Sequence, residues 1–513
     1  MNNLVHWYSN GFWLASFALI LWHYFRDREG LIKLFQLLFV IGISVYAISF
    51  SFLPKSAGQK LVILSRDLLI MGVISLMFQF LREFRRLYWL AVILLYALSR
   101  LFIGQWQRAS VHQASLSYTE NEWEILLELK DKDRKILAPI IKKYHLGIET
   151  AFKMVDEVGT SLDNVVALEV PEDRENLIPA IREELAALES VTWVEENEVV
   201  SEIPVIPITP YKSNFKPLTN DPHTDKQWSI ELLGWNQVMS QFREGRIIAK
   251  KKARIFILDT GVDGKHEDLN KNYESVESRF DDDPKGHGTH CAGIAAAVTN
   301  NAVGISSLNP GPEYVSVSSI KVLGNFGMGT QRDIINGILK AADQGADVIN
   351  LSLGGRSIDS RQKAYSEAVR YANARGVIVV VAAGNDNSDA RGFAPANADG
   401  VITVSAIDTS SNKASFSNSV ARIKNKIAAP GVSIFSTIPN NQYASFNGTS
   451  MAAPCVSGLV GLMKSIQPAL STEEVYSILA ETGSLSGDPE STGPVIHAGR
   501  AIDRLLKLYP PEN

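Results

Sequence analysis

Long apolar runs separated by short polar stretches fill the first hundred residues of the chain. Each run is close to the ~20 residues that a helix needs to cross the hydrocarbon core of a bilayer. No Lys or Arg precedes Arg26 and the first run lacks a convincing small-residue cleavage site, which disfavours a removed signal peptide. The pattern therefore predicts a four-helix transmembrane module over residues 1–105, with spans at about 4–25, 34–53, 61–81 and 87–103.

The basic residues of this region predict how the module is oriented. Most of them lie in two loops, between spans one and two and between spans three and four: Arg26, Arg28, Lys33, Arg82, Arg85 and Arg86. Because loops rich in Lys and Arg stay in the cytoplasm, both loops are expected there. The N-terminus and everything after residue 103 would then lie on the extracytoplasmic side of a multi-pass membrane protein, in contact with the lipid bilayer.

Arg66 and Asp67 are ionisable residues inside the third predicted span. An ionisable pair at such a place is either a functional site or a pair that reaches a nearby interface. The sequence leaves both interpretations open.

A second pattern begins after a polar linker at residues 106–120. It runs in order through a strand at 122–129, a helix at 134–146, a strand at 164–170, a helix at 174–188 and a strand at 191–200. This order predicts a ferredoxin-like α+β unit over residues 121–203, a fold that hosts many unrelated functions. The proline-rich stretch 204–219 indicates an exposed junction.

From residue 220 to residue 513 the pattern alternates between strands and helices. The strands at 253–261, 347–353 and 377–385 are almost continuous apolar runs, as expected when helices cover both faces of a parallel sheet. In such α/β sheets, sites form at the carboxyl ends of the strands. Asp259 and Asn385 each stand at such an end, although a lone Asp there is more often a turn or cap residue.

The stretch GHGTHCAGIAAA places histidines at the start of a small-residue helix. His287, His290 and Cys291 have the spacing of ligands on one helix face, which would suit zinc, but a fourth ligand has no obvious source. The alternative is that His287 is a general base, with Asp259 orienting its ring and a serine hydroxyl as its partner.

Ser450 lies in NGTSMAAPCVSG, also at the start of a predicted helix. A serine at this place is commonly an N-cap, because its oxygen can accept a hydrogen bond from an orphan backbone N–H. It could equally be a nucleophile that uses His287 as its base.

Six sequence blocks in a fixed order carry a family resemblance: ILDTGVDGKHEDL, GHGTHCAG, NLSLGG, AAGND, APGVSIFST and GTSMAAP. Together they resemble the signature of the subtilisin-like serine proteases, the subtilases, over about residues 220–505. The chain order Asp, His, Ser is that of subtilisin and differs from the orders in chymotrypsin and the α/β-hydrolases. The resemblance implies a subtilisin-like α/β fold with a parallel sheet and helices on both faces.

The resemblance also implies roles for individual residues. Asp259 would orient His287, His287 would act as general base and then acid, and Ser450 would be the nucleophile. Asn385 would donate to the oxyanion. The substrate backbone would pair with one strand, made of Ser352, Leu353, Gly354 and Gly355.

Two further expectations follow from the resemblance. The unit at 121–203 is similar to the inhibitor propeptides of subtilases, which implies a zymogen cut between about Val200 and Asn220. Asp221, Asp268 and Asn301 match a calcium site of the family in part, although the loop with Asn301 is one residue longer than usual. No cofactor would be required for the chemistry.

The charge distribution argues against nucleic-acid binding, and the cysteine content argues against a disulfide-stabilised fold. Residues 1–110 hold 11 Lys+Arg and 4 Asp+Glu, so the other 403 residues hold 39 and 51, a net charge of −12. An acidic soluble part argues against a nucleic-acid partner, which needs a clustered basic face. Only Cys291 and Cys455 are present, so there is no disulfide framework, and buried thiols are the default expectation.

The sequence therefore predicts a serine endopeptidase that acts on protein or peptide substrates through an acyl-enzyme. It would be made as a self-inhibited, autoprocessed, membrane-bound precursor with its catalytic domain outside. The alternative is a catalytically silent binding or regulatory membrane protein with the same fold.

Overall fold

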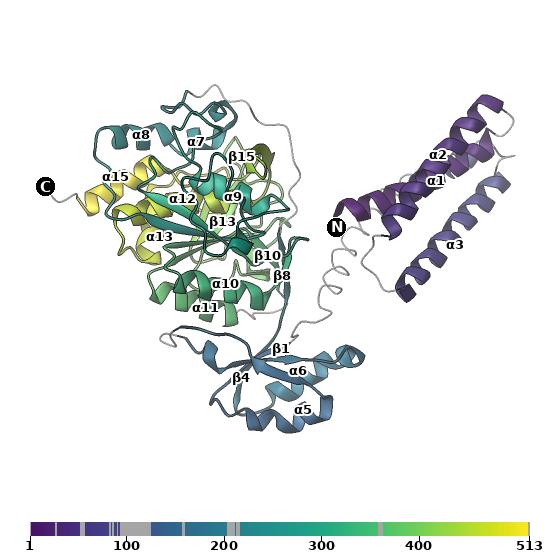
Figure 1. The fold of residues 1–513 in the computed structure, drawn as a ribbon, viewed down its shortest axis with the longest axis horizontal. Helices are drawn as coiled ribbons and strands as arrows, with labels where there is room; N and C mark the ends of the chain where they lie inside the picture. The colour runs from purple at the N-terminus through teal and green to yellow at the C-terminus, as the bar shows by residue number, and fades with distance from the viewer. Residues whose placement is uncertain are drawn as a thin grey trace. The chain divides into compact units, whose positions relative to one another are not determined.

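The computed structural model divides into two compact units, Met1–Glu122 and Trp123–Asn513 (Figure 1). The residues that it describes are 2–25, 28–51, 57–81, 84, 87–89, 91–92, 125–155, 160–202, 211, 216–357 and 363–510.

The first unit contains three long helices, α1 (Asn2–Tyr24), α2 (Glu29–Ser51) and α3 (Ala57–Leu81). Among the described residues, one segment is long and apolar enough to cross a membrane, Gly30–Ile48. The apolar parts of α1 and α3, Gly11–Trp22 and Ile70–Leu81, are shorter. The expected four-helix transmembrane module is therefore supported at one span only.

Polar residues explain why α3 falls short of the expected span. Lys60, Arg66 and Asp67 all lie in the N-terminal half of the helix, so its continuous apolar part begins only after them. Most of the fourth expected span, 87–103, lies outside the described residues.

Helices α1 and α2 pack closely through small residues. A Cβ atom on Gly42 would lie 2.5 Å from the backbone nitrogen of Ala15, and one on Gly11 would lie 2.5 Å from that of Tyr46. Small residues of this kind let helix backbones approach each other in membrane proteins. Asp67 on α3 is 2% exposed and accepts a hydrogen bond of 3.1 Å from the Tyr46 hydroxyl.

The second unit begins with a four-stranded antiparallel sheet in the order β2-β3-β1-β4, which is the βαββαβ arrangement of a ferredoxin-like fold. Its helices supply a buried apolar face against the sheet, with Ile181 and Leu185 fully buried. The elements are β1 (Ile125–Leu129), η1 (Arg134–Leu137), α5 (Ala138–Tyr144), β2 (Gly147–Thr150), η2 (Leu162–Asn164), β3 (Val165–Glu169), η3 (Glu172–Leu177), α6 (Ile178–Ala186) and β4 (Val191–Glu196).

The single strand expected at 191–200 is wrong, because the chain changes sheets within it. β4 ends at Glu196, and a new strand, β5 (Val199–Glu202), joins another sheet of order β12-β10-β5-β8. Between them, Asn197 Oδ1 accepts the Arg332 N–H and the Glu198 carbonyl accepts the Gln331 N–H. These contacts turn the chain away from the first sheet.

A six-stranded parallel sheet in the order β14-β13-β11-β9-β6-β7 forms the centre of the rest of the unit. The strands are almost wholly buried, as their continuous apolar runs predict. They are β6 (Ala253–Asp259), β7 (Val315–Lys321), β9 (Val348–Leu351), β11 (Ile378–Ala382), β13 (Ile402–Ile407) and β14 (Lys426–Pro430).

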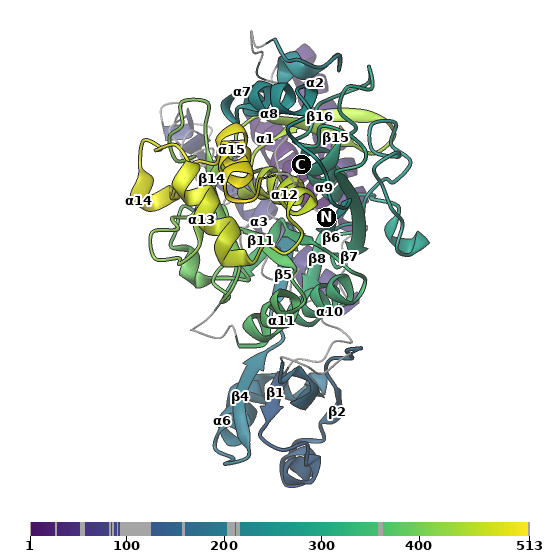
Figure 2. The same cartoon turned by 90° about the vertical axis from the view of Figure 1, so that its left-hand side faces the viewer.

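Helices cover both faces of this sheet (Figure 2). Alternate side chains of each strand serve opposite faces: Ile255 and Ile257 of β6 pack with one cluster, and Phe256 and Leu258 with the other. The first face meets α9 (His287–Ala296) and α12 (Thr449–Ile466), and the second meets α10 (Gln331–Asp343) and α11 (Lys363–Ala374).

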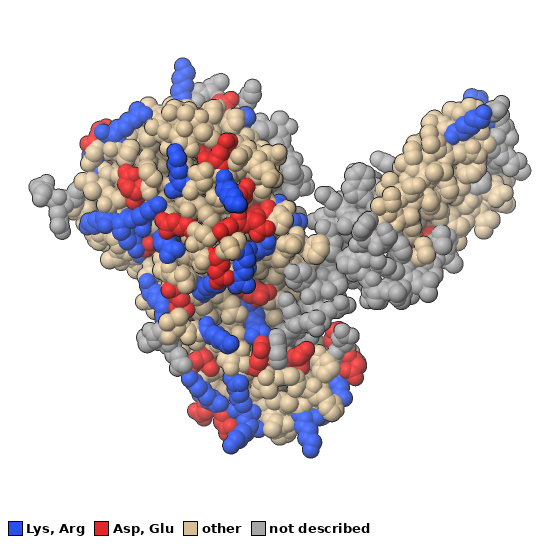
Figure 3. Space-filling view, viewed as in Figure 1, with Lys and Arg blue, Asp and Glu red and all other residues tan. Residues whose placement is uncertain are grey.

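The remaining elements surround this core. They are η4 (Thr224–Lys226), α7 (Trp228–Leu232), α8 (Trp235–Arg243), η5 (Ser278–Phe280), β8 (Met328–Thr330), β10 (Leu353–Arg356), η6 (Ala390–Gly392), β12 (Phe393–Ala394), β15 (Ile434–Ile438), β16 (Gln442–Phe446), α13 (Thr472–Thr482), α14 (Pro489–Thr492) and α15 (Ala498–Leu508). On the face drawn in Figure 3, acidic and basic side chains of this unit are interspersed.

All 18 residues of α12 are buried, and the helix packs directly on α9. A Cβ on Gly458 would lie 2.8 Å from the Ala295 carbonyl oxygen of α9. Since a backbone oxygen cannot rotate away, the distance between the two helices depends on this glycine.

Replacing Gly458 by valine is expected to push α12 away from α9, and overpacking of this kind costs about 1–3 kcal/mol. The thermal unfolding midpoint of the full chain in detergent measures this loss. Gly392→Val is the matched control, because a Cβ at Gly392 meets nothing within 4 Å. Equal midpoints for the two variants would contradict the close packing of the helices.

Candidate active site

Three neighbouring strands of the parallel sheet lead into one group of polar residues. Asp259 is the last residue of β6, Ser352 follows β9, and Asn385 lies three residues beyond β11. Because β6, β9 and β11 are adjacent, their carboxyl ends lie at one edge. The next strand in the chain after β6, β7, lies on one side of β6, and the later strands β9 and β11 lie on its other side. The strand order therefore reverses at β6, and the group of polar residues lies at this topological switch point.

The ring of His287 is fixed by the carboxylate of Asp259. Nδ1 of His287 donates to Asp259, 2.8 Å from Oδ1 and 2.9 Å from Oδ2. The two residues are 3% and 0% exposed, so the buried carboxylate depends on these donors. Gly288 allows the approach, because a Cβ there would lie 2.0 Å from the Gly261 carbonyl oxygen.

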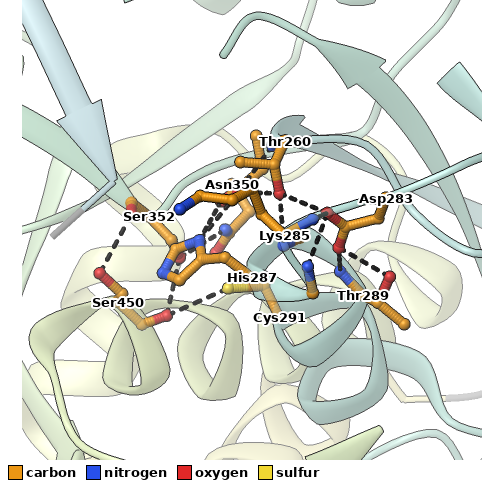
Figure 4. A network of polar contacts seen from close by, with 12 residues as sticks. Thr260, Asp283, Lys285, His287, Thr289, Cys291, Asn350, Ser352 and Ser450 are labelled. Carbon is orange, nitrogen blue, oxygen red and sulfur yellow. Dashed lines mark hydrogen bonds and ion pairs between the residues drawn. The ribbon is translucent and has the colours of Figure 1, made fainter. Parts of the chain in front are cut away.

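Asp283 was not predicted from the sequence, yet it holds the segment before His287 (Figure 4). Its carboxylate accepts hydrogen bonds from the Gly286 and Thr289 N–H groups, at 2.9 and 2.8 Å, and from the Thr260 hydroxyl, at 2.8 Å. Burial raises the pKa of Asp283, and these donors oppose the shift. In the sequence the residue is the last of three consecutive aspartates, which resemble an exposed acidic turn.

Ser450 is the second residue of α12, and Gly448 occupies the N-cap position. The N-cap interpretation of Ser450 is therefore wrong. Its hydroxyl donates to the Ser352 carbonyl oxygen at 3.0 Å, and the Ser352 hydroxyl donates to the Ser450 carbonyl oxygen at 2.8 Å (Figure 4). This reciprocal pair joins the start of α12 to the end of β9.

Two buried side chains extend this connection. Asn350 Nδ2 donates to Ser352 Oγ at 2.9 Å, and the Ser457 hydroxyl donates to Asn350 Oδ1 at 2.9 Å. Neither residue could be recognised from the sequence, since a polar residue inside an apolar strand gives no sign of its partner. Together they connect Ser352, the partner of Ser450, to a later turn of α12.

Asn385 has its amide orientation fixed. Its Oδ1 accepts hydrogen bonds from both the N–H and the hydroxyl of Thr449, each at 2.9 Å. The Nδ2 group therefore turns the other way, and a Cβ on Gly448 would lie 3.1 Å from it. A side-chain donor thus lies beside the first residues of α12, where the positive end of the helix dipole is found.

The segment Ser352–Gly355 enters β10, which pairs on one side with β12 and on the other with β5. Leu353 faces Glu202 and Gly354 faces Ser201 in an antiparallel register. β5 also pairs with β8 on its other side. A strand of the chain itself thus occupies the groove between β8 and β10.

The zinc alternative is not supported by the positions of the three residues. His290 Nε2 lies 3.0 Å from the Ala444 carbonyl oxygen, and its ring stacks on Phe446 at 4.2 Å. Burial lowers the pKa of His290 to about 3, so it is a neutral core residue. Within the described residues, one trio has its possible ligand atoms close together, Asp259, His287 and Cys291, and it already contains the Asp259–His287 hydrogen bond.

Both cysteines are free and buried, as expected by default. Cys291 Sγ lies 3.4 Å from the Ser450 carbonyl oxygen. Burial raises the pKa of the Cys455 thiol to about 12, which makes it unreactive.

The three candidate calcium ligands come together, but donors already occupy their oxygens. Asp221 accepts the Asn300 and Asn301 N–H groups and the Ser306 hydroxyl, and Asp268 accepts the Ile305 N–H. The Val303 N–H donates to Asn301 Oδ1, which turns Asn301 Nδ2 towards Asp268, at 2.9 Å. Since an N–H group cannot ligate a cation, this set does not fit calcium.

Comparison with known proteins gives a family for the second unit. The model of the Subtilase family (Peptidase_S8) matches residues 250–494. Subtilisin DY of Bacillus licheniformis is 40% identical over 269 residues, which cover 51% of this chain and 92% of that protein.

The likeness extends into the residues before 250. Subtilisin J of Geobacillus stearothermophilus is 29% identical over 410 residues, 77% of this chain and 93% of that protein. The 410 matched residues are more than the chain has after residue 250, so the match includes residues before it. A solved structure of a protease from Pseudoalteromonas arctica matches 56% of this chain and 99% of its own, with 28% identity and a TM-score of 0.50.

The Asp268 carboxyl generates a prediction about pH. Burial raises its pKa from 3.8 to about 7, so the folded state binds the proton more tightly than the unfolded state does. Stability from this group is complete below about pH 4 and is lost as the pH rises towards about 7. The free energy of unfolding should fall by about 2 kcal/mol between pH 5 and pH 8, and this slope should be absent in Asp268→Asn.

The same experiment, repeated with excess calcium and with a chelator, separates the two accounts of this site. Identical unfolding midpoints in both solutions are expected. A midpoint of the wild-type chain that rises with calcium at pH 8, and not in Asp268→Asn, would show that a cation binds there after all.

Proposed function

The chain belongs to the subtilase family. On this basis we propose which residues catalyse the reaction, and that the enzyme is made as an inactive precursor. It is a subtilisin-like serine endopeptidase that acts on protein or peptide substrates, and the family needs no cofactor for catalysis. The observation that carries the proposed mechanism is the buried Asp259–His287 hydrogen bond beside the Ser450 end of α12.

In this mechanism Ser450 Oγ attacks the carbonyl carbon of the substrate bond while His287 Nε2 takes its proton. Asp259 accepts from Nδ1, which keeps Nε2 as the acceptor and stabilises the imidazolium that forms. His287 then protonates the leaving nitrogen, and an acyl group remains on Ser450. Water, activated by the same histidine, releases the acyl group.

Asn385 and the start of α12 would stabilise the oxyanion. The orientation of the Asn385 amide, with Oδ1 held by Thr449, supports a donor role for Nδ2. The Ser450 N–H would be the second donor, because it belongs to the orphan groups of the first helical turn.

Ser352, Leu353, Gly354 and Gly355 would bind the substrate backbone. The pairing of β5 with β10 supports this role, because an extended segment already adds there as a strand. A Cβ on Gly355 would lie 3.1 Å from the Val199 carbonyl oxygen, so the glycine allows close approach of a bound peptide.

We propose that the ferredoxin-like unit is an inhibitor propeptide. Glu195, which is 2% exposed, accepts hydrogen bonds from the Lys363 N–H at 2.9 Å and Gln331 Nε2 at 3.0 Å. Asn197 accepts the Arg332 N–H at 2.9 Å. The unit thus caps the N-terminal ends of α10 and α11, and β5 follows directly into the groove.

A second set of contacts supports the same docking. Arg332 of α10 forms an ion pair with Glu149 and donates to the Ala151 carbonyl oxygen at 3.0 Å. On α11, Glu367 accepts the Ser161 N–H at 3.2 Å. The proposed maturation step is a cut between about Val200 and Asn220, made by Ser450.

The N-terminal unit would anchor this precursor in a membrane. Large apolar side chains of α2 face outward, with Leu37, Val40 and Ile48 57%, 58% and 61% exposed. Figure 3 draws few charged side chains on this unit. Lipid would cover such a surface more favourably than water, and the basic loops of the sequence favour an extracytoplasmic catalytic domain.

Calcium is not needed in this proposal. Its expected ligands have hydrogen-bond donors in place of a cation, and the chelation arm of the Asp268 experiment decides the matter.

Replacement of Ser450 by alanine is expected to abolish hydrolysis of a chromogenic peptide. Asn385→Ala should lower kcat by about 10²–10³ with little change in KM, the loss measured for the corresponding donor of subtilisin. Ser388→Ala, in the same loop, is the control. Retained hydrolysis in Ser450→Ala would make the enzyme's nucleophile another residue.

Glu195→Ala is expected to weaken the docked propeptide, because the N–H groups of Lys363 and Ala364 at the start of α11 lose their acceptor. A loss of about 2 kcal/mol corresponds to roughly 30-fold weaker inhibition. The measurement is hydrolysis of a small peptide by the uncut full chain. Glu196→Ala, one residue along in β4, removes a side chain that pairs within the propeptide itself, with Arg182, and should change nothing. Equal rates for wild type and both variants would count against inhibition.

A further inference from the structure

Asp283 is a second buried carboxylate near the site, and five hydrogen-bond donors converge on it (Figure 4). The residue is 4% exposed. Three donors are the backbone N–H groups of Lys285 at 3.1 Å, Gly286 at 2.9 Å and Thr289 at 2.8 Å. The other two are the hydroxyls of Thr260 and Thr289, each at 2.8 Å. Such a set suits an ionised carboxylate, which only accepts hydrogen bonds.

The two hydroxyls are oriented as donors to this carboxylate. The Thr260 hydroxyl oxygen accepts the Gly288 N–H at 3.1 Å, and the Thr289 hydroxyl oxygen accepts the Asp263 N–H at 3.0 Å. Each hydroxyl therefore keeps its own proton to donate to Asp283. Burial raises the pKa of Asp283, but a proton on its carboxyl would need an acceptor, and these five partners are donors. The arrangement thus favours the charged form.

One hydroxyl joins this carboxylate to the Asp259–His287 pair. Thr260 Oγ1 lies 2.8 Å from Asp283 Oδ1 and 3.2 Å from Asp259 Oδ1. Asp259 Oδ1 lies in turn 2.8 Å from His287 Nδ1. Asp283 also accepts N–H groups on both sides of His287 in the chain. Its negative charge is thus buried close to the imidazole, where water screens it little.

The other titratable groups on the elements packed against α9 are neutral, exposed or distant. On α9 and α12, His290 is neutral and the two cysteines are buried thiols. Asp268 is buried at the other end of α9, where its carbonyl oxygen accepts the Val298 N–H. β15 carries no titratable side chain. The charged residues near the N-terminal end of α9 are half-buried or exposed: Asp263, Lys265, Asp281, Asp282, Lys285 and Lys321.

We propose that Asp283 is a positioning residue of the reaction, whose buried negative charge stabilises the imidazolium of His287. The inference rests on the proposed function, since it needs His287 as the base of Ser450. When His287 takes the proton of Ser450, its ring becomes positive, and a preorganised anion nearby favours that form. Asp283 would do this without touching the reacting atoms, because its own donors occupy both of its oxygens.

The run of three aspartates supplies a matched control. Asp282 directly precedes Asp283, its side chain is 73% exposed and it lies 4.0 Å from Lys321. Asp283→Asn and Asp282→Asn remove the same charge, one from a buried position and one from the surface. Because exposed charges are screened by salt, Asp282→Asn should behave as wild type.

The first measurement is the pH profile of peptide hydrolysis by enzyme made from the full chain in membranes. In Asp283→Asn the acid limb of kcat/KM should move to lower pH by about one unit, because the imidazolium loses a buried negative neighbour. On the alkaline plateau kcat should fall by up to about tenfold with little change in KM, since the transition state contains the same imidazolium.

A second measurement needs no activity. In the Ser450→Ala background, NMR of isotope-labelled histidine follows the His287 ring, whose signal is identified by its loss in His287→Ala. His287 should gain its proton at a pH about one unit lower in Asp283→Asn than in the chain with Asp283 or in Asp282→Asn. Unfolding midpoints verify the fold, and Asp283→Ser, which is also neutral and smaller, replaces Asp283→Asn if that chain does not fold.

The outcomes separate the inference from the proposed function. A fall in kcat with no movement of the acid limb or of the NMR titration would make Asp283 a purely structural residue and overturn the inference. Equal movement in Asp282→Asn would overturn it as well, because burial would then not matter. A wild-type chain without Ser450-dependent hydrolysis overturns the proposed function, and with it the role in catalysis, whatever the NMR titration shows.

Discussion

The burial of the Asp259 carboxylate at the end of β6 is the constraint around which the catalytic domain is arranged. A buried charge is costly unless donors surround it, and here the Thr260 N–H and His287 Nδ1 supply them. The histidine can reach the carboxylate only because Gly288 lets α9 approach the turn after β6. Asp283 then holds the backbone on either side of His287, so one carboxylate fixes the ring and another fixes the segment that carries it.

The position of Ser450 depends on a separate set of contacts. α12 crosses the same face of the sheet as α9, and Gly458 sets the distance between them. Ser352, Asn350 and Ser457 tie the start of α12 to β9. Since β6 and β9 are adjacent strands, both halves of the site rest on one rigid sheet, which is what precise positioning of reacting groups requires.

In the proposed function, the groove between β8 and β10 would bind both the substrate and the inhibitory strand β5. Main-chain pairing accepts any extended segment, so the same strand, β10, can receive a substrate or β5. The contacts of the ferredoxin-like unit are with α10 and α11, helices that carry neither His287 nor Ser450, and in the proposed function they would favour β5 over a substrate. Under the proposed function, β5 would occupy this groove in the way that a substrate does.

Much of the fold and the main site could be predicted from the sequence, because buried parallel strands are apolar throughout and their ends are marked by Asp259 and Asn385. The division of β4 from β5 could not, since the alternation of VTWVEENEVV continues without a break and only contacts with α10 and α11 separate the strands. The role of Asp283 could not be predicted either, because the residue ends a run of three aspartates that resembles a solvent-exposed turn. The calcium site was predicted from the types of residue present. Whether those residues can bind a cation depends on the orientation of the Asn301 amide, whose Nδ2 group points towards Asp268.

Covalent labelling can test whether His287 activates Ser450. A phosphonofluoridate bonds to an activated serine oxygen, and peptide mapping by mass spectrometry locates the adduct. We expect one adduct on Ser450 of the matured chain, none on Ser457 in the same helix, and none in His287→Ala. An unlabelled Ser450 in a chain that hydrolyses peptides, or equal labelling in His287→Ala, would contradict it.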